Sequence, residues 1–208
     1  MKKQWFRWLL ASQLLVAGVA QALLAPGNQA PDFALQAARG GDTFEYHLYQ
    51  ELEKGPVVIF FYPKAFTSGC TVQARMFARA KDQFSALGAS IIGLSADSLE
   101  VAKDFSQKEC SSAYPVVADP DGKAVKAYDV SMMLGSATSK RASYVITPDR
   151  KIFYVYSDMS PQDHVTKTLD AVKRWNSLQP APADATEPAA WDAAPAPAAN
   201  VPVPPNVD

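Results

Sequence analysis

The sequence predicts an α/β fold with a central mixed sheet flanked by helices. Short apolar runs rich in β-forming residues alternate with stretches of helical periodicity through the middle of the chain. Two further runs of this kind, close to the end of that region, flank a turn signal and predict a hairpin. With 208 residues and 48% hydrophobic composition, the chain is expected to bury one core and form one domain.

The first predicted unit is a strand followed by a helix. Residues 57–62 read VVIFFY behind Gly55-Pro56, which is typical of a strand buried on both faces of a sheet. After a loop over 64–67, Ser68 is the expected N-cap of a helix whose apolar side chains recur at helical spacing. Gly88 is expected to close this helix.

A second unit repeats that order. Residues 90–94 predict another buried strand, and residues 95–97 lead into a helix of about a dozen residues that ends near Cys110. Residues 114–118 predict a third strand, and Asp119-Pro120-Asp121-Gly122 is a strong turn signal. Strands that alternate with helices in this way require a parallel sheet core.

The last elements have a different order. Residues 143–146 and 152–156 flank Thr147-Pro148-Asp149-Arg150 and predict an antiparallel hairpin. A closing amphipathic helix is expected to begin near Pro161, with Pro161 in its first turn, and to carry on one side Val165, Leu169, Val172 and Trp175. A parallel half, a hairpin and a closing helix together predict a thioredoxin-like fold.

The N-terminus has the layout of a signal peptide. Lys2, Lys3 and Arg7 precede an apolar run that ends at the small-residue triplet Ala20-Gln21-Ala22. We therefore expect residues 1–22 to be a signal peptide cleaved after Ala22, which predicts a periplasmic protein. The alternative is an uncleaved inner-membrane anchor with the domain facing the periplasm, because the apolar run could nearly span a thin bilayer.

The C-terminus differs in composition from the rest of the chain. Residues 179–208 hold eight of the 16 prolines and many alanines, with Trp191 as the single large apolar side chain besides valine. Such a segment is predicted to be a disordered or semi-stiff tail, with a binding arm as the alternative. Residues 23–178 remain as the predicted domain. They carry no net charge, so no basic field attracts nucleic acid, and a monomer or weak dimer is expected.

Cys70 is the candidate nucleophile. It falls in the first turn of the helix predicted directly after the buried strand, where unpaired backbone N–H groups and the helix dipole stabilise an anion. A thiolate is favoured there. Thr67, three residues earlier, offers a hydroxyl to the sulfur or to a substrate oxygen, and Pro63 can limit the access of water. The competing interpretation of one cysteine at such a junction is a structural residue.

The spacing Pro63-x-x-x-Thr67-x-x-Cys70 resembles the active-site motif of the peroxiredoxin family, and it is most similar to the Q-type, or bacterioferritin-comigratory, branch. The resemblance covers residues 27–177 and includes the segments APDFAL at 30–35, FYPK at 61–64 and ADPDG at 118–122. It implies a thiol-dependent peroxidase that reduces hydrogen peroxide and organic hydroperoxides through a cysteine sulfenic acid. It also implies that Arg141 lies over the cysteine as a second catalytic residue. No cofactor and no metal site are predicted.

Several residues depart from the branch pattern. Ala65 and Gln73 stand where many Q-type members carry Asp and Glu, which predicts altered acidity around the pocket rather than lost chemistry. Cys110 is a candidate resolving cysteine, although Q-type relatives place that residue about one helical turn earlier. A free thiol and a permanent structural disulfide are the other two interpretations of Cys110.

The expected partners are a peroxide and a thiol reductant. An exported enzyme does not meet cytosolic thioredoxin, so the reductant is expected to be an envelope thioredoxin-like protein or a small thiol. Two other function classes stay open: an exported thiol-disulfide oxidoreductase and a non-enzymatic envelope interaction protein. The first normally needs Cys-x-x-Cys, but this chain has Gln73 at the second cysteine position. His47 and His164 are expected at the surface or a strand edge, and Trp175 is expected to anchor the last helix.

Overall fold

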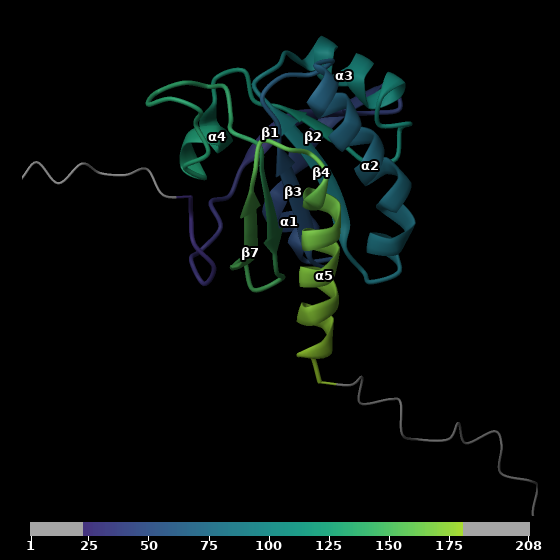
Figure 1. The fold of residues 1–208 in the computed structure, drawn as a ribbon, viewed down its shortest axis with the longest axis vertical. Coiled ribbons are helices and arrows are strands. Elements are labelled where there is room, and N and C mark those ends of the chain that lie inside the picture. Colours follow the sequence, from purple (N-terminus) through teal and green to yellow (C-terminus); the bar gives the residue numbers. More distant parts are fainter. Residues whose placement is uncertain (1–22, 181–208) are drawn as a thin grey trace, which may run out of the picture.

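The computed structural model describes residues 23–180, so the predicted leader at 1–22 and the tail from 181 onward lie outside the described residues (Figure 1). The strands are β1 (Ala34–Arg39), β2 (Asp42–His47), β3 (Val57–Phe61), β4 (Ser90–Ser95), β5 (Val116–Ala118), β6 (Ala142–Ile146) and β7 (Ile152–Ser157). The helices are α1 (Leu48–Leu52), α2 (Ser68–Ser85), α3 (Leu99–Lys108), α4 (Lys123–Ala127) and α5 (Asp163–Ser177).

All seven strands form one mixed sheet in the order β2-β1-β5-β4-β3-β6-β7. β4 runs parallel to both β3 and β5, whereas β6 pairs antiparallel with β3 and with β7. The parallel centre and the antiparallel hairpin at one edge confirm the predicted thioredoxin-like fold. β3 therefore lies inside the sheet, as its unbroken apolar sequence predicts.

The sheet separates two apolar cores because side chains alternate along each strand. Val58 and Phe60 of β3 face one core, to which α2, α3 and α5 contribute. Val57, Ile59 and Phe61 face the other core, beneath α1 and α4. Figure 1 shows α2 and α5 on the side of the sheet away from α4. Burial on both faces fixes β3 along its length, and it also fixes the start of the loop that follows.

Four elements were not predicted. β1 and β2 form an antiparallel hairpin that joins the sheet through the pairing of β1 with β5. The sequence of β1, ALQAAR, is dominated by alanine, which is a weak β-former. That of β2, DTFEYH, alternates apolar Phe44 and Tyr46 with polar residues, but only over a short stretch. α1 and α4 have five residues each, which is too short for helical periodicity to show.

Two predicted helix starts are corrected by the structure. Ser68 is the first residue of α2 rather than its cap, and Thr67 takes the N-cap position with an extended backbone. α5 begins at Asp163 with Gln162 as its N-cap, so Pro161 precedes the helix rather than occupying its first turn. Gly88 follows α2 in a left-handed conformation, and Ala89 N donates to Phe84 O as the chain leaves the helix.

The prediction for His164 was wrong. The side chain is fully buried and lies in the first turn of α5, with Nδ1 2.8 Å from Ser143 Oγ of β6. The helical face that carries Leu169 and Val172 toward the sheet also carries His164, and a polar partner on β6 makes its burial tolerable. His47 ends β2 at the sheet edge, and Trp175 is half-buried. Within residues 23–180, no helix is long and apolar enough to cross a membrane.

Candidate active site

The loop between β3 and α2 is pinned by hydrogen bonds and one aromatic contact. Ala65 N donates to Asp97 Oδ2 at 2.7 Å, and Ser95 Oγ donates to the same oxygen at 2.9 Å. Phe66 has a left-handed backbone with φ of 61°, and its ring packs edge-on against Phe105 with centroids 5.2 Å apart. A non-glycine residue holds such a backbone only where its surroundings enforce it. These contacts therefore fix the position of the loop and of the first residues of α2.

The first turn of α2 leaves backbone donors available for an anion. The carbonyl of Thr67 accepts from Thr71 N at 2.9 Å, and no side chain caps the helix. Within the described chain, the N–H groups of residues 68–70 consequently have no partner. The Thr67 hydroxyl donates its hydrogen to Lys64 O at 2.9 Å. Its oxygen can therefore only accept a hydrogen bond from the cysteine or from a substrate.

Arg141 and Cys70 meet because of the register of the sheet. Ala142 pairs with Phe61, so the residue before β6 lies beside the residues that leave β3. The Arg141 Nη2 is 3.4 Å from Cys70 Sγ. Both side chains are buried, with exposed fractions of 4% for Arg141 and 1% for Cys70. The structure thus brings together the two residues predicted to act on the peroxide, and their catalytic roles stay a prediction.

The rest of the Arg141 guanidinium is held by neutral oxygens. Nη1 donates to Gln73 Oε1 at 2.5 Å, and Nε donates to the backbone carbonyl of Met159 at 3.0 Å. Within residues 23–180, no carboxylate forms an ion pair with this arginine. A buried cation requires an anionic partner, and the Cys70 sulfur is the contacting group that can become one. The arrangement can bind a sulfur anion and a developing oxyanion.

Two contributors to this site have little signal in the sequence. A Cβ at Gly69 would lie 3.0 Å from Arg141 Nη2, so glycine at this position gives the guanidinium room to approach the helix. Met159 contributes only its carbonyl, which every residue type possesses. For Gly69, its place directly before Cys70 is a weak signal that sequence reasoning could have used. For Met159, the residue type gives no signal.

Pro63 and Cys110 flank the site in different ways. Pro63 follows Tyr62 at the end of the central strand and is half-buried. Cys110 lies just beyond α3, is fully buried, and belongs to the same apolar core as Cys70. Burial raises the pKa of the Cys110 thiol to about 12. Both cysteines are free thiols, so the structure does not contain the permanent disulfide that the sequence left open.

Comparison with known families and proteins gives consistent matches. The model of the AhpC/TSA family matches residues 26–155. A Mycobacterium tuberculosis protein named as a peroxiredoxin is 34% identical over 150 residues, which are 71% of this chain and 95% of that protein. Peroxiredoxin Q of the chloroplast of Oryza sativa is 29% identical over 147 residues, and the chain spans 65% of the length of that relative.

Solved structures agree with these matches. The crystal structure of peroxidoxin BcpB from Mycobacterium tuberculosis is 30% identical, has a TM-score of 0.67, and is matched over 98% of its length and 74% of this chain. Peroxiredoxin Q of Xanthomonas campestris is 27% identical with a TM-score of 0.60, over 91% of its length and 68% of this chain.

Proposed function

This chain belongs to the AhpC/TSA family, and from that membership we propose that it is a thiol-dependent peroxidase in which Cys70 attacks the peroxide. The observation that carries the proposal is the buried Arg141 guanidinium, 3.4 Å from Cys70 Sγ and without a carboxylate partner among the described residues. Such a pair stabilises a sulfur anion in a site that excludes bulk water. The substrates proposed are hydrogen peroxide and organic hydroperoxides.

The reaction begins with the Cys70 thiolate and one peroxide. The sulfur attacks the terminal peroxide oxygen, an S–O bond forms, and the O–O bond breaks. Sulfur is oxidised to a sulfenic acid, and the departing oxygen leaves as an alkoxide or hydroxide. That oxygen takes up one proton and departs as an alcohol or water. This uptake balances the one proton that the thiol lost when it ionised.

The protein contributes mainly by stabilising charge. As the O–O bond breaks, negative charge moves from sulfur to the departing oxygen. Arg141 already contacts the sulfur, and the N–H groups of residues 68–70 are unpaired at the start of the same helix, so little reorganisation is needed. A preorganised donor of this kind lowers the barrier by ~2–4 kcal/mol. Thr67 and Pro63 shape the loop that presents these donors.

Return of the sulfenic acid to a thiol requires a reductant. A thiol condenses with the sulfenic acid to give a disulfide and water, and a second thiol then reduces the disulfide. Cys110 supplies the first thiol if its segment opens, because a buried thiol with a pKa of about 12 is not a nucleophile in place. Ser111 and Ser112, directly after it, both have left-handed backbones, which favours local opening there.

Intact mass measurement decides the role of Cys110. Reduced protein is treated with one equivalent of hydrogen peroxide, with and without the substitution Cys110→Ser. Loss of two hydrogens in the wild-type protein, together with gain of one oxygen in the variant, supports Cys110 as the resolving cysteine. Gain of one oxygen in both proteins assigns resolution to an external thiol and overturns the resolving role.

The experiment for the peroxidase function is single-turnover consumption of peroxide. Reduced wild-type protein should remove about one equivalent of peroxide, and Cys70→Ser should remove none. Cys110→Ser is the matched control, because it removes the other thiol while leaving the nucleophile. Equal consumption by Cys70→Ser and the wild type would overturn the proposal. A disulfide-reduction assay tests the thiol-disulfide oxidoreductase alternative, which Gln73 disfavours because it occupies the second cysteine position and binds Arg141.

We further propose that the protein is exported to the periplasm by residues 1–22 and acts there as a monomer or weak dimer. The charged and apolar composition of that leader supports export. An envelope thioredoxin-like protein or a small thiol is then the reductant. Cell fractionation with mass analysis of the mature N-terminus tests this location: a protein that begins at Leu23 in the periplasm agrees, and an intact leader in the membrane fraction favours the anchored alternative. Deleting residues 180–208 tests the interaction-protein alternative: lost localisation with unchanged peroxide reduction leaves the tail secondary to an enzyme and counts against that alternative.

A further inference from the structure

We propose that His164 is a positioning residue for the reaction at Cys70, because it holds the segment whose backbone carbonyl orients Arg141. The segment is residues 157–160, which leave β7 and lead toward α5. This inference rests on the proposed peroxidase function and deepens it. His164 contacts neither Cys70 nor the guanidinium, so its effect passes through the backbone of this segment.

The hydrogen bonds of His164 define its tautomer. Nε2 lies 2.9 Å from the backbone carbonyl oxygen of Asp158, and Nδ1 lies 2.8 Å from Ser143 Oγ. A carbonyl oxygen can only accept, so Nε2 carries the hydrogen. In the neutral ring, Nδ1 then accepts from the Ser143 hydroxyl. The imidazole consequently connects Asp158, directly after β7, to Ser143 of β6, and Ser143 lies two residues after Arg141.

The residue after Asp158 makes the contact that matters for the site. Met159 O accepts from Arg141 Nε at 3.0 Å. The carbonyls of Asp158 and Met159 belong to consecutive residues, so fixing the first limits the movement of the second. The guanidinium is planar and rigid, and a displacement of Nε therefore also moves Nη2, which is 3.4 Å from Cys70 Sγ.

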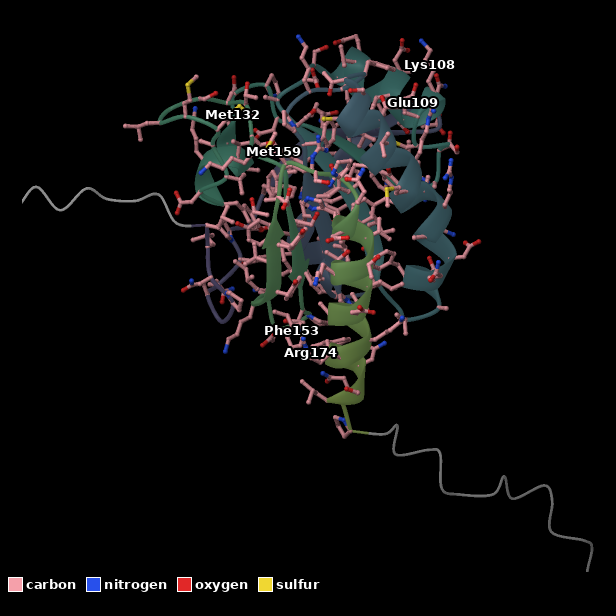
Figure 2. The ribbon with its side chains drawn as sticks, viewed as in Figure 1. Lys108, Glu109, Met132, Phe153, Met159 and Arg174 are labelled. Carbon is pink, nitrogen blue, oxygen red and sulfur yellow. The ribbon has the colours of Figure 1, made fainter. Side chains whose placement is uncertain are left out.

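Ser157 pairs with Ala142 at the end of the β6–β7 ladder, and beyond that pair the segment has few other anchors in the core. Residues 157–160 are all exposed, and the Met159 side chain is 55% exposed. Figure 2 shows Met159 at the end of the β7–α5 pair opposite Phe153 and Arg174. Ser160 N donates to Asp158 Oδ1, a bond within the segment, and Ser157 Oγ donates to Arg141 O. Among these contacts, His164 is the fully buried side chain that connects the segment to the core.

The surroundings keep the imidazole neutral. Burial lowers the pKa of His164 from its usual value of 6.5, and the nearby positive charge of Arg141 lowers it further. The hydrogen bond to the Asp158 carbonyl acts in the opposite direction. A neutral ring keeps Nδ1 as an acceptor for Ser143 and Nε2 as a donor to the segment, so the bonding pattern of the structure persists at neutral pH.

A pair of amide substitutions separates positioning from simple core packing. In His164→Gln, the side-chain amide nitrogen reaches about as far as Nε2 and can donate to Asp158 O, whereas in His164→Asn the shorter amide reaches only the Ser143 side. We expect the single-turnover rate of peroxide consumption to fall about 10-fold or more in His164→Asn and to stay within about 3-fold of the wild type in His164→Gln. The pH profile of iodoacetamide alkylation of Cys70 should move to higher pH in the Asn variant alone.

The control variant is Thr168→Val. The Thr168 hydroxyl donates to His164 O at 2.6 Å within α5, so the substitution perturbs the same buried helix face without touching residues 157–160. It should lower thermal stability and leave the peroxide rate unchanged. Equal rates in the Asn and Gln variants would overturn the proposal, as would rate losses in all three variants that follow their stability.

A measurement on the unsubstituted histidine covers the case in which the variants do not fold. Nitrogen-15 spectra of the wild-type protein should show a neutral His164 protonated at Nε2, and they should shift on Arg141→Gln substitution. Protonation at Nδ1, or no response to that substitution, contradicts the inference. These spectra and the alkylation profile do not depend on turnover. If wild-type protein left peroxide unconsumed, the proposed function would fail while the positioning of Arg141 could still be decided.

Discussion

Replacing Arg141 with glutamine removes the cation that contacts Cys70. The guanidinium is 4% exposed and donates to the sulfur, to Gln73 Oε1 and to Met159 O. Glutamine is shorter and neutral, so it cannot span these three acceptors. The change therefore tests whether the buried charge stabilises the reacting sulfur and the departing oxygen.

The expected magnitude follows from those contacts. A hydrogen bond to a charged group contributes about 1.5–3 kcal/mol, which corresponds to about a 10- to 150-fold change in rate. Loss of a donor to an oxyanion in a preorganised site costs about 10²- to 10³-fold. In the proposed mechanism Arg141 serves both the thiolate and the departing oxygen, so we expect the single-turnover rate with hydrogen peroxide to fall by at least about 10²-fold at pH 7.

Stopped-flow consumption of peroxide by reduced protein in the Cys110→Ser background measures this rate without interference from the second thiol. Leaving the buried Gln73 Oε1 without its donor costs about 1–3 kcal/mol of stability, so rates are compared well below the melting temperature of the variant. Arg174→Gln is the matched control, because that arginine lies over Phe153 and Tyr154 at the far end of α5. A rate for Arg141→Gln within about 3-fold of the control would refute this account of the site.

Three further predictions concern other residues. Gly69→Ala places a Cβ 3.0 Å from Arg141 Nη2, so the guanidinium must shift and the peroxide rate should fall about 10-fold. Gly135→Ala is the control and should leave the rate unchanged, because there is open space around its Cβ position. Equal rates in the two variants would contradict the role given to Gly69 in making room for Arg141. Burial raises the pKa of the Cys110 thiol from 9.0 to about 12, so as the pH rises the unfolded chain loses the thiol proton before the folded protein does. The free energy of unfolding, measured with urea, should therefore fall by up to about 1.4 kcal/mol per pH unit between those two pKa values. Cys110→Ala should remove that component, and an unchanged slope would count against it. Gly93→Ala places a Cβ 2.7 Å from the ring of Phe60, and it should cost about 1–3 kcal/mol in the free energy of unfolding; a cost near zero would show that the ring has room to move.

The fold and the placement of Cys70 at a helix start could be predicted from sequence because both depend on local patterns. The apolar run at 57–62 and the helical spacing after Ser68 fix a strand, a loop and a helix in order, and Cys70 falls at the start of that helix. Arg141 came from the family resemblance alone. Its contact with Cys70 depends on the antiparallel register of β6 and β3, which relates residues 71 positions apart.

What the sequence missed depends on tertiary contacts that residue type does not encode. The sequence of β1 is weak in β-formers, and pairing with β2 on one side and with β5 on the other holds it in the sheet. His164 looks like a surface residue until Ser143 supplies a buried partner from another strand. Met159 enters the site through its carbonyl, and the acceptor role of a carbonyl is set by the path of the backbone.

Trapping the sulfenic acid tests most directly whether Cys70 is the residue that attacks peroxide. Reduced wild-type protein is treated with one equivalent of hydrogen peroxide in the presence of dimedone, and its peptides are mapped by mass spectrometry. The proposed function predicts a dimedone adduct on Cys70 or, where resolution is faster than trapping, a disulfide between Cys70 and Cys110. An adduct on Cys110 with Cys70 still reduced would contradict it.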